Sequence, residues 1–471
     1  MTMASLRAEL LTLTRLGAPV ALSQLGIMIM GAVETLLVGH LGAVELAAST
    51  LGNVWEWNWL CVGLGLVMGI DPMISQAHGR GDGPATALAL QRGLVLALIV
   101  SVPICVALLF TREGLVFLGQ DPVVAEAAGR YNLYKLPTAP CFLLCSALRL
   151  YLQGRTLMLP VTLVMWLGNV VHALLAVSLV YGGLGLPALG LVGAAIAESV
   201  TFCLMLLGLV GTMLRWRLYD GAWRRWDGQS FAGSGLLRTV RLGVPVGMQI
   251  AFEAWAFSIA TFMAGWLGRD AVGSHQIVLN LAALAFMIPL GVSQGAATRV
   301  GNLVGAGDTA GLKAACSAAL LLGAAVMVPP ALIFTVFQER LPQLYGDDPD
   351  VVRQAAAILP IAAAFQLCDG CQVVASGVLR GLGRPDAGAL LSLLGYYVIA
   401  LPLAYVAAFV WGYGLPGIWG ALALGLTLVA FALMLLLRRE ARRPIGELVS
   451  VRNTLPPPSR TALSAKGTWV M

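Results

Sequence analysis

Acidic side chains lie inside stretches of this sequence that are otherwise apolar. The candidates for chemistry are Glu34, Glu56, Glu198, Glu253 and Asp369. A carboxylate at mid-bilayer costs about 2.5–3.5 kcal/mol even on the lenient insertion scale, so its presence needs a compensating reason. Two carboxylates that share a site repel each other, and a proton, a sodium ion or an organic cation relieves that repulsion. These residues therefore predict reversible binding of cations.

The depth of the acids separates them into two groups. At 1.5 Å per residue, Glu253 lies about 15 Å into its apolar stretch, and Asp369 lies about 12 Å from the end of its own. Both are therefore near mid-membrane and form the predicted cation site. Glu34 lies about 25 Å into its stretch, and Glu56 stands at a similar height, nearer the outer face.

Aromatic rings accompany the two deeper acids in the sequence. Trp255 and Phe257 stand near Glu253, Phe365 stands one turn before Asp369, and Tyr396 and Tyr397 lie in the eleventh apolar stretch. A flat organic cation would gain from ring faces beside a carboxylate. An aromatic residue in a membrane helix is more often a packing residue, so both interpretations stay open. Further candidate contributors are Glu56, Glu198 and Asn169.

Structural explanations also stay open for several acids. A position at the outer rim would leave Glu34 solvated, and Glu56, which stands between two tryptophans, fits an interfacial aromatic belt. Glu198 fits a buried hydrogen-bonding role in helix packing. Core, rim or capping roles are expected for His172, His275 and Asp71.

The elements that must position these residues are membrane-spanning helices. Of the 471 residues, 59% are apolar and only 11% are charged, against about 25% charged in soluble domains. The apolar runs hold roughly 20 residues or more, enough to cross about 30 Å of hydrocarbon and too long for the strands of a barrel. Charged loops and Gly and Pro breaks give twelve predicted spans: 16–38, 47–72, 88–110, 128–152, 160–182, 188–212, 243–267, 274–300, 312–337, 352–378, 387–411 and 415–437.

The two halves of the chain are copies of one unit. Residues 15–82 align without a gap with residues 241–308 at an offset of 226, and the offset becomes 227 further on. The repeat predicts an all-α integral membrane protein whose two six-helix lobes are related by a pseudo-two-fold axis along the membrane normal. The predicted N-lobe is 1–225, and the C-lobe is 226–440. A basic, proline-containing tail at 441–471 is predicted to be cytoplasmic and disordered.

The repeat keeps glycines and prolines, which shape helices, but it does not keep the acids. Glu253 aligns with Ile27, and Asp369 aligns with Phe142. A structural role shared by both lobes would be expected in both copies. Acids confined to one copy therefore indicate an added function.

Basic residues lie mainly on one side of the predicted membrane. The chain ends and the loops after even-numbered spans hold 23 of the 29 Lys and Arg residues. The opposite side holds Arg112, Arg130, Lys135, Arg269, Arg340 and Arg353. By the positive-inside rule, both termini are predicted to be cytoplasmic. The net charge of +6 is mostly this bias, and no soluble segment is large enough to bind nucleic acid.

Several short segments form a specific constellation of motifs. They are Val33-Glu34-Thr35, Ser75-Gln76-Ala77-His78-Gly79, Gln366-Leu367-Cys368-Asp369-Gly370 and Gly395-Tyr396-Tyr397. In these segments the chain resembles the multidrug and toxic compound extrusion (MATE) family, most closely its NorM-like branch. The resemblance covers almost all of residues 10–437.

The resemblance implies a V-shaped pair of lobes that exchanges a cytoplasmic organic cation for inward-moving protons or sodium. Glu253 and Asp369 match the branch's coupling-ion acids, and they would be metal ligands only with sodium as the coupling ion. Glu34 matches the first-span acid, which is usually an aspartate. Phe365 stands where members often carry a tyrosine, which weakens the case for sodium and leaves protons equally open. The expected protein is a monomer in the lipid bilayer of the cell inner membrane, without an organic cofactor.

Two rival functions are open at this point. A flippase for lipid-linked oligosaccharides or peptidoglycan precursors, from the same superfamily, would need cationic residues for a pyrophosphate. No Lys or Arg stands at mid-span, apart from Arg130 and Lys135 near the outer end of the fourth span. A membrane enzyme or receptor is the other rival. The sequence has no P-loop and no HExxH or GxSxG motif, so we expect no enzyme and a gradient as the energy source.

Overall fold

The chain folds into a bundle of long helices. The computed structural model describes residues 3–183, 185–346, 348–441 and 443. Within these ranges the regular elements are helices, together with an isolated bridge between Gly183 and Leu186. Apart from residues 441 and 443, the predicted disordered tail lies outside the described part of the chain.

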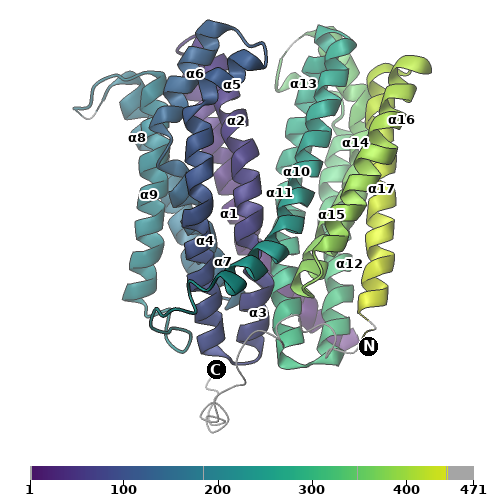
Figure 1. Cartoon of the computed structure of the whole chain (residues 1–471). Coiled ribbons are helices and arrows are strands. Elements are labelled where there is room, and N and C mark those ends of the chain that lie inside the picture. The colour runs from purple at the N-terminus through teal and green to yellow at the C-terminus, as the bar shows by residue number, and fades with distance from the viewer. Residues whose placement is uncertain (1–2, 184, 347, 442, 444–471) are drawn as a thin grey trace.

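The helices divide into two groups that stand side by side (Figure 1). The first half of the chain forms α1 (Met3–Gly39), α2 (Ala43–Met68), α3 (Asp71–Gly79), α4 (Gly83–Leu109), α5 (Thr111–Phe117), α6 (Pro122–Tyr134), α7 (Thr138–Gly154), α8 (Leu159–Tyr181) and α9 (Leu191–Arg215). The second half forms α10 (Gly233–Trp266), α11 (Arg269–Ala306), α12 (Thr309–Val336), α13 (Arg340–Gln343), α14 (Pro349–Gly381), α15 (Asp386–Leu393), α16 (Leu401–Tyr405) and α17 (Gly414–Glu440), with π-helical turns at Leu394–Ala400 and Val406–Val410.

Eleven helical segments of the described chain are long and apolar enough to cross a membrane. The remaining predicted span, the fourth (128–152), is divided between α6 and α7, so the expectation of a continuous helix there is wrong. The helix breaks over Lys135-Leu136-Pro137, because Pro137 has no N–H for the carbonyl four residues earlier. Tighter turns replace the helix there, with Lys135 N bonded to Asn132 O at 3.1 Å. The counterpart helix α14 is continuous.

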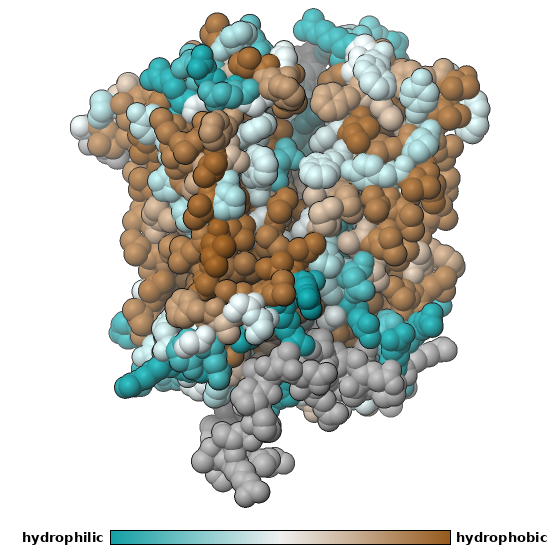
Figure 2. All heavy atoms as spheres, in the orientation of Figure 1, coloured by the Kyte–Doolittle hydropathy of each residue, from teal (hydrophilic) through white to brown (hydrophobic). Residues whose placement is uncertain are grey.

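Apolar residues dominate the flank of the bundle, and hydrophilic residues gather at its two ends (Figure 2). Helices α1 and α17 respectively begin and end at the same end of the bundle, which we call the terminal face (Figure 1). Helices α5, α6 and α13 lie at the opposite face. Apolar flanks with polar ends are the pattern of a protein that crosses a bilayer more than once.

The glycines kept by the sequence repeat hold the two halves together. Gly65 of α2 lies against the backbone of Gly247 on α10, where a Cβ atom would collide. The repeated counterpart of Gly65 is Gly291 of α11, which lies in the same way against Ala21 of α1. Small residues let helix backbones approach closely. The two crossings are copies of each other, as the predicted pseudo-two-fold axis requires.

Each half also receives the beginning of the other half's first helix. Leu13 of α1 is buried in the hydrophobic cluster of α11, α12 and α14. Val246 of α10 is buried in the cluster of the first half, with Leu242 and Ile250 packed against it. The boundary between the two packed cores therefore runs through α1 and α10 rather than between α9 and α10.

Polar contacts join the halves near the terminal face. Arg380 Nε of α14 lies 3.3 Å from Asp71 Oδ2 of α3, and both side chains are buried. Gln153 Nε2 donates to Gln294 O at 3.2 Å. At the other end, the surface is hollowed between the two halves (Figure 2). The conformation is therefore closed at the terminal face and open at the opposite face.

Candidate functional site

Glu253 of α10 accepts hydrogen bonds from three neutral side chains. Gln372 Nε2 of α14 donates to Glu253 Oε1 at 2.7 Å. Gln249 Nε2, one turn earlier on α10, and Ser392 Oγ of α15 each donate to the same oxygen at 3.1 Å. Three donors on one oxygen suit an ionised carboxylate, which only accepts hydrogen bonds. The surrounding helices therefore hold a negative charge in place, and Glu253 Oε2 is left for another ligand.

Asp369 of α14 lies within electrostatic range of Glu253. Both carboxylates are half-buried, and no hydrogen-bond donor of the described residues lies against Asp369. Their counterparts in the repeat, Ile27 and Phe142, line one small cavity in the first half. The structure brings the two predicted acids together, and the second half carries charge where the first is apolar.

The four predicted aromatic residues do not share one environment. Phe365 is 3% exposed and packs against Phe257 and Trp419, with ring centres 6.0 and 6.1 Å apart. Tyr396 is also buried, against Phe257. In this conformation these two are packing residues, which is one of the two interpretations left open for them. Trp255 is 40% exposed, so its ring is accessible.

Of the two remaining rings, Trp255 lies at the boundary between the halves. Trp255 Nε1 donates to Asn58 Oδ1 of α2 at 2.8 Å. Tyr397 is half-buried and its hydroxyl donates to Phe252 O at 3.3 Å, while Phe252 packs between the rings of Tyr397 and Trp255. Trp255 and Tyr397 are therefore the predicted aromatics that a ligand could reach.

A second cluster of acids lies in the first half. Glu56 of α2 and Glu198 of α9 both form ion pairs with Lys135, the latter at 2.6 Å between Nζ and Oε2. Glu34 of α1 bonds to the hydroxyl of Tyr131 on α6. Glu34 and Glu56 are 4% and 3% exposed, so a solvated rim for Glu34 and an interfacial belt for Glu56 are wrong. Glu198 is half-buried, with a side chain that is 13% exposed, and its ion pair with Lys135 fits the structural explanation for it.

Lys135 is predicted near the outer end of the fourth span, and the structure shows it buried where that span breaks. Sequence reasoning missed the neutral partners of Glu253. Pro137 near Lys135 is a signal for the break, and the glutamines one turn from Glu253 and Asp369 are a signal for the partners.

Other predicted residues have local roles. Asn169 of α8 donates to Met165 O at 2.9 Å and lies against Gly26. No contact of the described residues joins Asn169 to either acid cluster. His275 is a satisfied core histidine, bonded to Thr261 Oγ1 and Trp419 Nε1. Asp71 begins α3 as expected, but its carboxylate binds Arg380.

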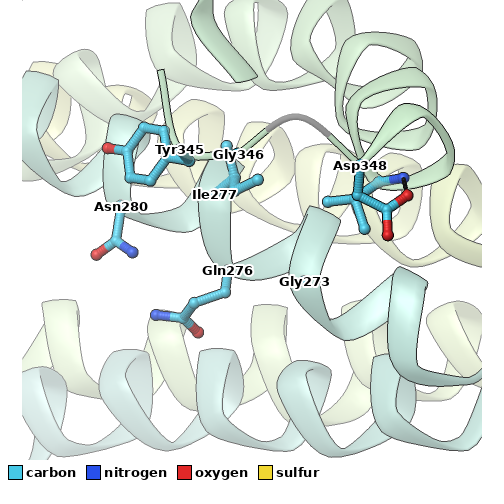
Figure 3. A pocket seen from close by; sticks show the side chains of 8 residues that line it. Gly273, Gln276, Ile277, Asn280, Tyr345, Gly346 and Asp348 are labelled. Carbon is cyan, nitrogen blue, oxygen red and sulfur yellow. Dashed lines mark hydrogen bonds between the residues drawn. The ribbon is translucent and has the colours of Figure 1, made fainter. Parts of the chain in front are cut away.

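A cavity of about 380 Å³ lies elsewhere. It is formed between the first turns of α11 and the turn before α14, where Gln276, Asn280 and Tyr345 stand around it (Figure 3). Its carboxylate, Asp348, caps α14 by accepting from Asp350 N at 3.0 Å. None of the predicted site residues lines this cavity. No group of three or more His, Cys, Asp or Glu in the described ranges could hold a metal ion.

Comparisons with known proteins agree on the fold and the family. The MatE family model matches residues 19–178 and 245–406. The probable multidrug resistance protein NorM of Rhizobium meliloti is 34% identical, over 91% of this chain and 94% of that protein. Multidrug and toxin extrusion protein 2 of Mus musculus is 30% identical, over 95% and 77%. The crystal structure of the eukaryotic MATE transporter AtDTX14 has a TM-score of 0.86 and 23% identity, covering 94% of this chain and 100% of that one.

Proposed function

The chain belongs to the MatE family, and from that premise we propose that it is a secondary active multidrug efflux transporter. It exports small organic cations in exchange for inward-moving H⁺ or Na⁺. The observation that carries this proposal is the pair Glu253 and Asp369, two carboxylates inside the membrane without a basic partner among the described residues. Such a pair binds a cation because a cation relieves the repulsion between the two charges.

The conformation closed at the terminal face is the outward-facing state in this proposal. The terminal face is cytoplasmic, in keeping with the 23 basic residues predicted on that side. The hollow between the halves opens to the outside (Figure 2). The protein acts as a monomer in the cell inner membrane, with the bilayer around its apolar flank.

The exchange cycle follows from competition for Glu253 and Asp369. In the inward-facing state, an organic cation binds the pair and lies against Trp255 and Tyr397. After the halves change over, H⁺ or Na⁺ from outside neutralises the pair, and the organic cation leaves. Each positive charge that moves inward gains about 2.3 kcal/mol per 100 mV, in addition to the ion gradient.

Either coupling ion suits the residues at the pair. A proton needs only the carboxylates themselves. Sodium would take oxygens from Glu253, Asp369 and the Ser392 hydroxyl, and Phe365 offers no hydroxyl to complete that set. The protein therefore supplies an incomplete set of ligands for Na⁺, and water would have to supply the rest.

Liposome transport tests this proposal directly. Purified protein is reconstituted, a pH gradient and a sodium gradient are imposed separately, and ethidium efflux is recorded. We expect efflux with at least one gradient and none with Asp369→Asn. Asp348→Asn is the matched control, because it changes an acid of the same helix that only caps its N-terminus. Wild-type efflux from Asp369→Asn, at equal protein abundance, would remove the assignment of the pair.

The flippase alternative gains no support from the first half's buried cations. Lys135 is already paired with Glu56 and Glu198. Arg149 donates to Gln24 Oε1 at 2.9 Å and lines a cavity of about 20 Å³. That space holds about one water molecule and no pyrophosphate. No observation favours an enzyme or a receptor.

A further inference from the structure

Lys135 is a cation inside the membrane that the exchange cycle does not use. We propose that its ammonium group acts as a tethered cation, which fills the acid cluster of the first half and keeps sodium and organic cations out of it. Lys135 is then a specificity-determining residue that confines exchange to Glu253 and Asp369. This inference rests on the proposed cation exchange.

The break between α6 and α7 places Lys135 inside the lobe. Its side chain is 1% exposed. The helix ends at Tyr134, and the three-residue turn before Thr138 directs the lysine inward instead of toward lipid or the outer surface. An uncompensated ammonium group at this depth would be costly, so the acids around it must be its partners.

Two carboxylate oxygens and one amide oxygen surround the ammonium group. Lys135 Nζ pairs with Glu56 Oε2 and lies 2.6 Å from Glu198 Oε2. It donates to Asn53 Oδ1 at 2.7 Å. An ammonium group has three donors, and three oxygens surround it here, although Glu198 Oε2 is paired by charge alone and has no hydrogen-bond partner within the described chain. Carboxylate and amide oxygens are also what a hard cation takes from a protein, so Lys135 stands where such an ion would bind.

Glu34 is linked to the lysine through Asn53 and Tyr131. Asn53 Oδ1 accepts from Lys135 Nζ and lies 3.0 Å from the Tyr131 hydroxyl. That hydroxyl also donates to Glu34. Glu34 therefore belongs to the same polar cluster as Lys135, and this cluster already contains a cation.

Unpartnered atoms show what would hold a cation if Lys135 were absent. Glu56 Oε1 is buried and has no hydrogen-bond partner within the described chain. The same is true of both ring nitrogens of His172, which is fully buried within range of the charges on Glu198 and Lys135. Without the lysine, two carboxylates and an amide oxygen would surround an empty position, with the His172 ring within electrostatic range.

The second half has no equivalent of the lysine. At the offset of 227, Lys135 aligns with Ala362, a buried residue of α14. Glu253 accepts only from neutral groups, and no ion pair of the described residues includes Glu253 or Asp369. One half therefore holds a permanent internal cation, and the other keeps its acids available. A tethered group competes with free ions as an intramolecular ligand, so ordinary ion concentrations do not displace it.

Equilibrium binding to purified protein tests this inference, with ethidium and radioactive sodium as separate probes. We expect the variant Glu253→Gln/Asp369→Asn, which keeps Lys135, to bind neither probe. If this variant still binds either probe, and adding Glu56→Gln removes that binding, the inference is overturned. This comparison does not require any change at Lys135.

A second comparison adds Lys135→Gln to the same double variant. We expect sodium binding to appear, and to be lost again when Glu198→Gln is added. Lys135→Arg is the matched control, because it keeps the positive charge and should leave the site closed. A folded Lys135→Gln protein, judged by gel filtration, that gains no binding of either probe would overturn the inference. A wild-type protein that binds neither probe would instead contradict the proposed function.

Discussion

The ion pair between Asp71 and Arg380 allows a quantitative test of the outward-facing state. The pair joins the halves near the terminal face through one contact at 3.3 Å, and Asp71 Oδ1 and Arg380 Nη2 have no partner among the described residues. Removing one partner of a buried pair costs about 3–5 kcal/mol, because the other charge is left uncompensated. The incomplete hydrogen bonding places this pair at the lower end, about 3 kcal/mol.

We expect Arg380→Met to destabilise the outward-facing state relative to the inward-facing one. In the inward-facing state the halves separate at the terminal face, and Asp71 regains water. Since about 1.4 kcal/mol is a factor of ten, the ratio of the two states should shift by about 100-fold. Asp71→Asn/Arg380→Met removes both charges and should return most of that shift.

Distance measurements between two spin labels check this expectation. Cysteines replace Arg80, at the end of α3, and Lys313, near the start of α12, in a background without the eight native cysteines. A longer distance should dominate in Arg380→Met, and the shorter one in the double variant. Arg384→Met is the control, since its pair with Glu440 is 4.0 Å apart and Arg384 is 41% exposed. An unchanged distribution in Arg380→Met would refute the reasoning.

Two further perturbations test the halves' contact and the ring near the acids. Gly65→Leu should lower the free energy of unfolding by about 1–3 kcal/mol and reduce ethidium efflux, because the new side chain meets the Gly247 backbone. Gly211→Leu is the control, since Gly211 faces open space, and it should leave the free energy of unfolding unchanged. Equal effects of the two substitutions would contradict the packing argument. Trp255→Ala should weaken ethidium binding by about 3- to 30-fold, because the ring is lost. Trp255→Phe keeps a ring and loses only the hydrogen bond to Asn58, so it should keep most of the ethidium affinity. A fluorescence titration measures both affinities, and equal losses in the two variants would argue against a ring contact.

The sequence is most informative where it repeats. Gly65 and Gly291 occupy copied positions, and both lie at the crossings between the halves. The two-lobe architecture can therefore be predicted from the amino-acid sequence alone, because close backbone approach requires glycine. Glu253 and Asp369 can be found for a different reason. A charge in an apolar stretch is conspicuous, and its depth follows from counting residues along the helix.

The environment of the acids is harder to predict from the sequence. Hydropathy treats 128–152 as one span, so it does not reveal the turn that brings Lys135 to Glu56. The burial of Phe365 depends on which side of α14 faces the aromatic core, and helices that are apolar on all sides give no periodic signal for that. The neutral donors to Glu253 are missed because uncharged polar side chains do not stand out.

The reciprocal placement of Leu13 and Val246 has a consequence for the origin of the molecule. A single ancestral unit, encoded before the duplication, would have lacked the segment that fills its own core. Two copies related by a two-fold axis would have supplied it to each other, as in a domain-swapped homodimer. Fusion into one polypeptide then freed the copies to diverge, so that one could acquire a lysine and the other an unneutralised pair of acids.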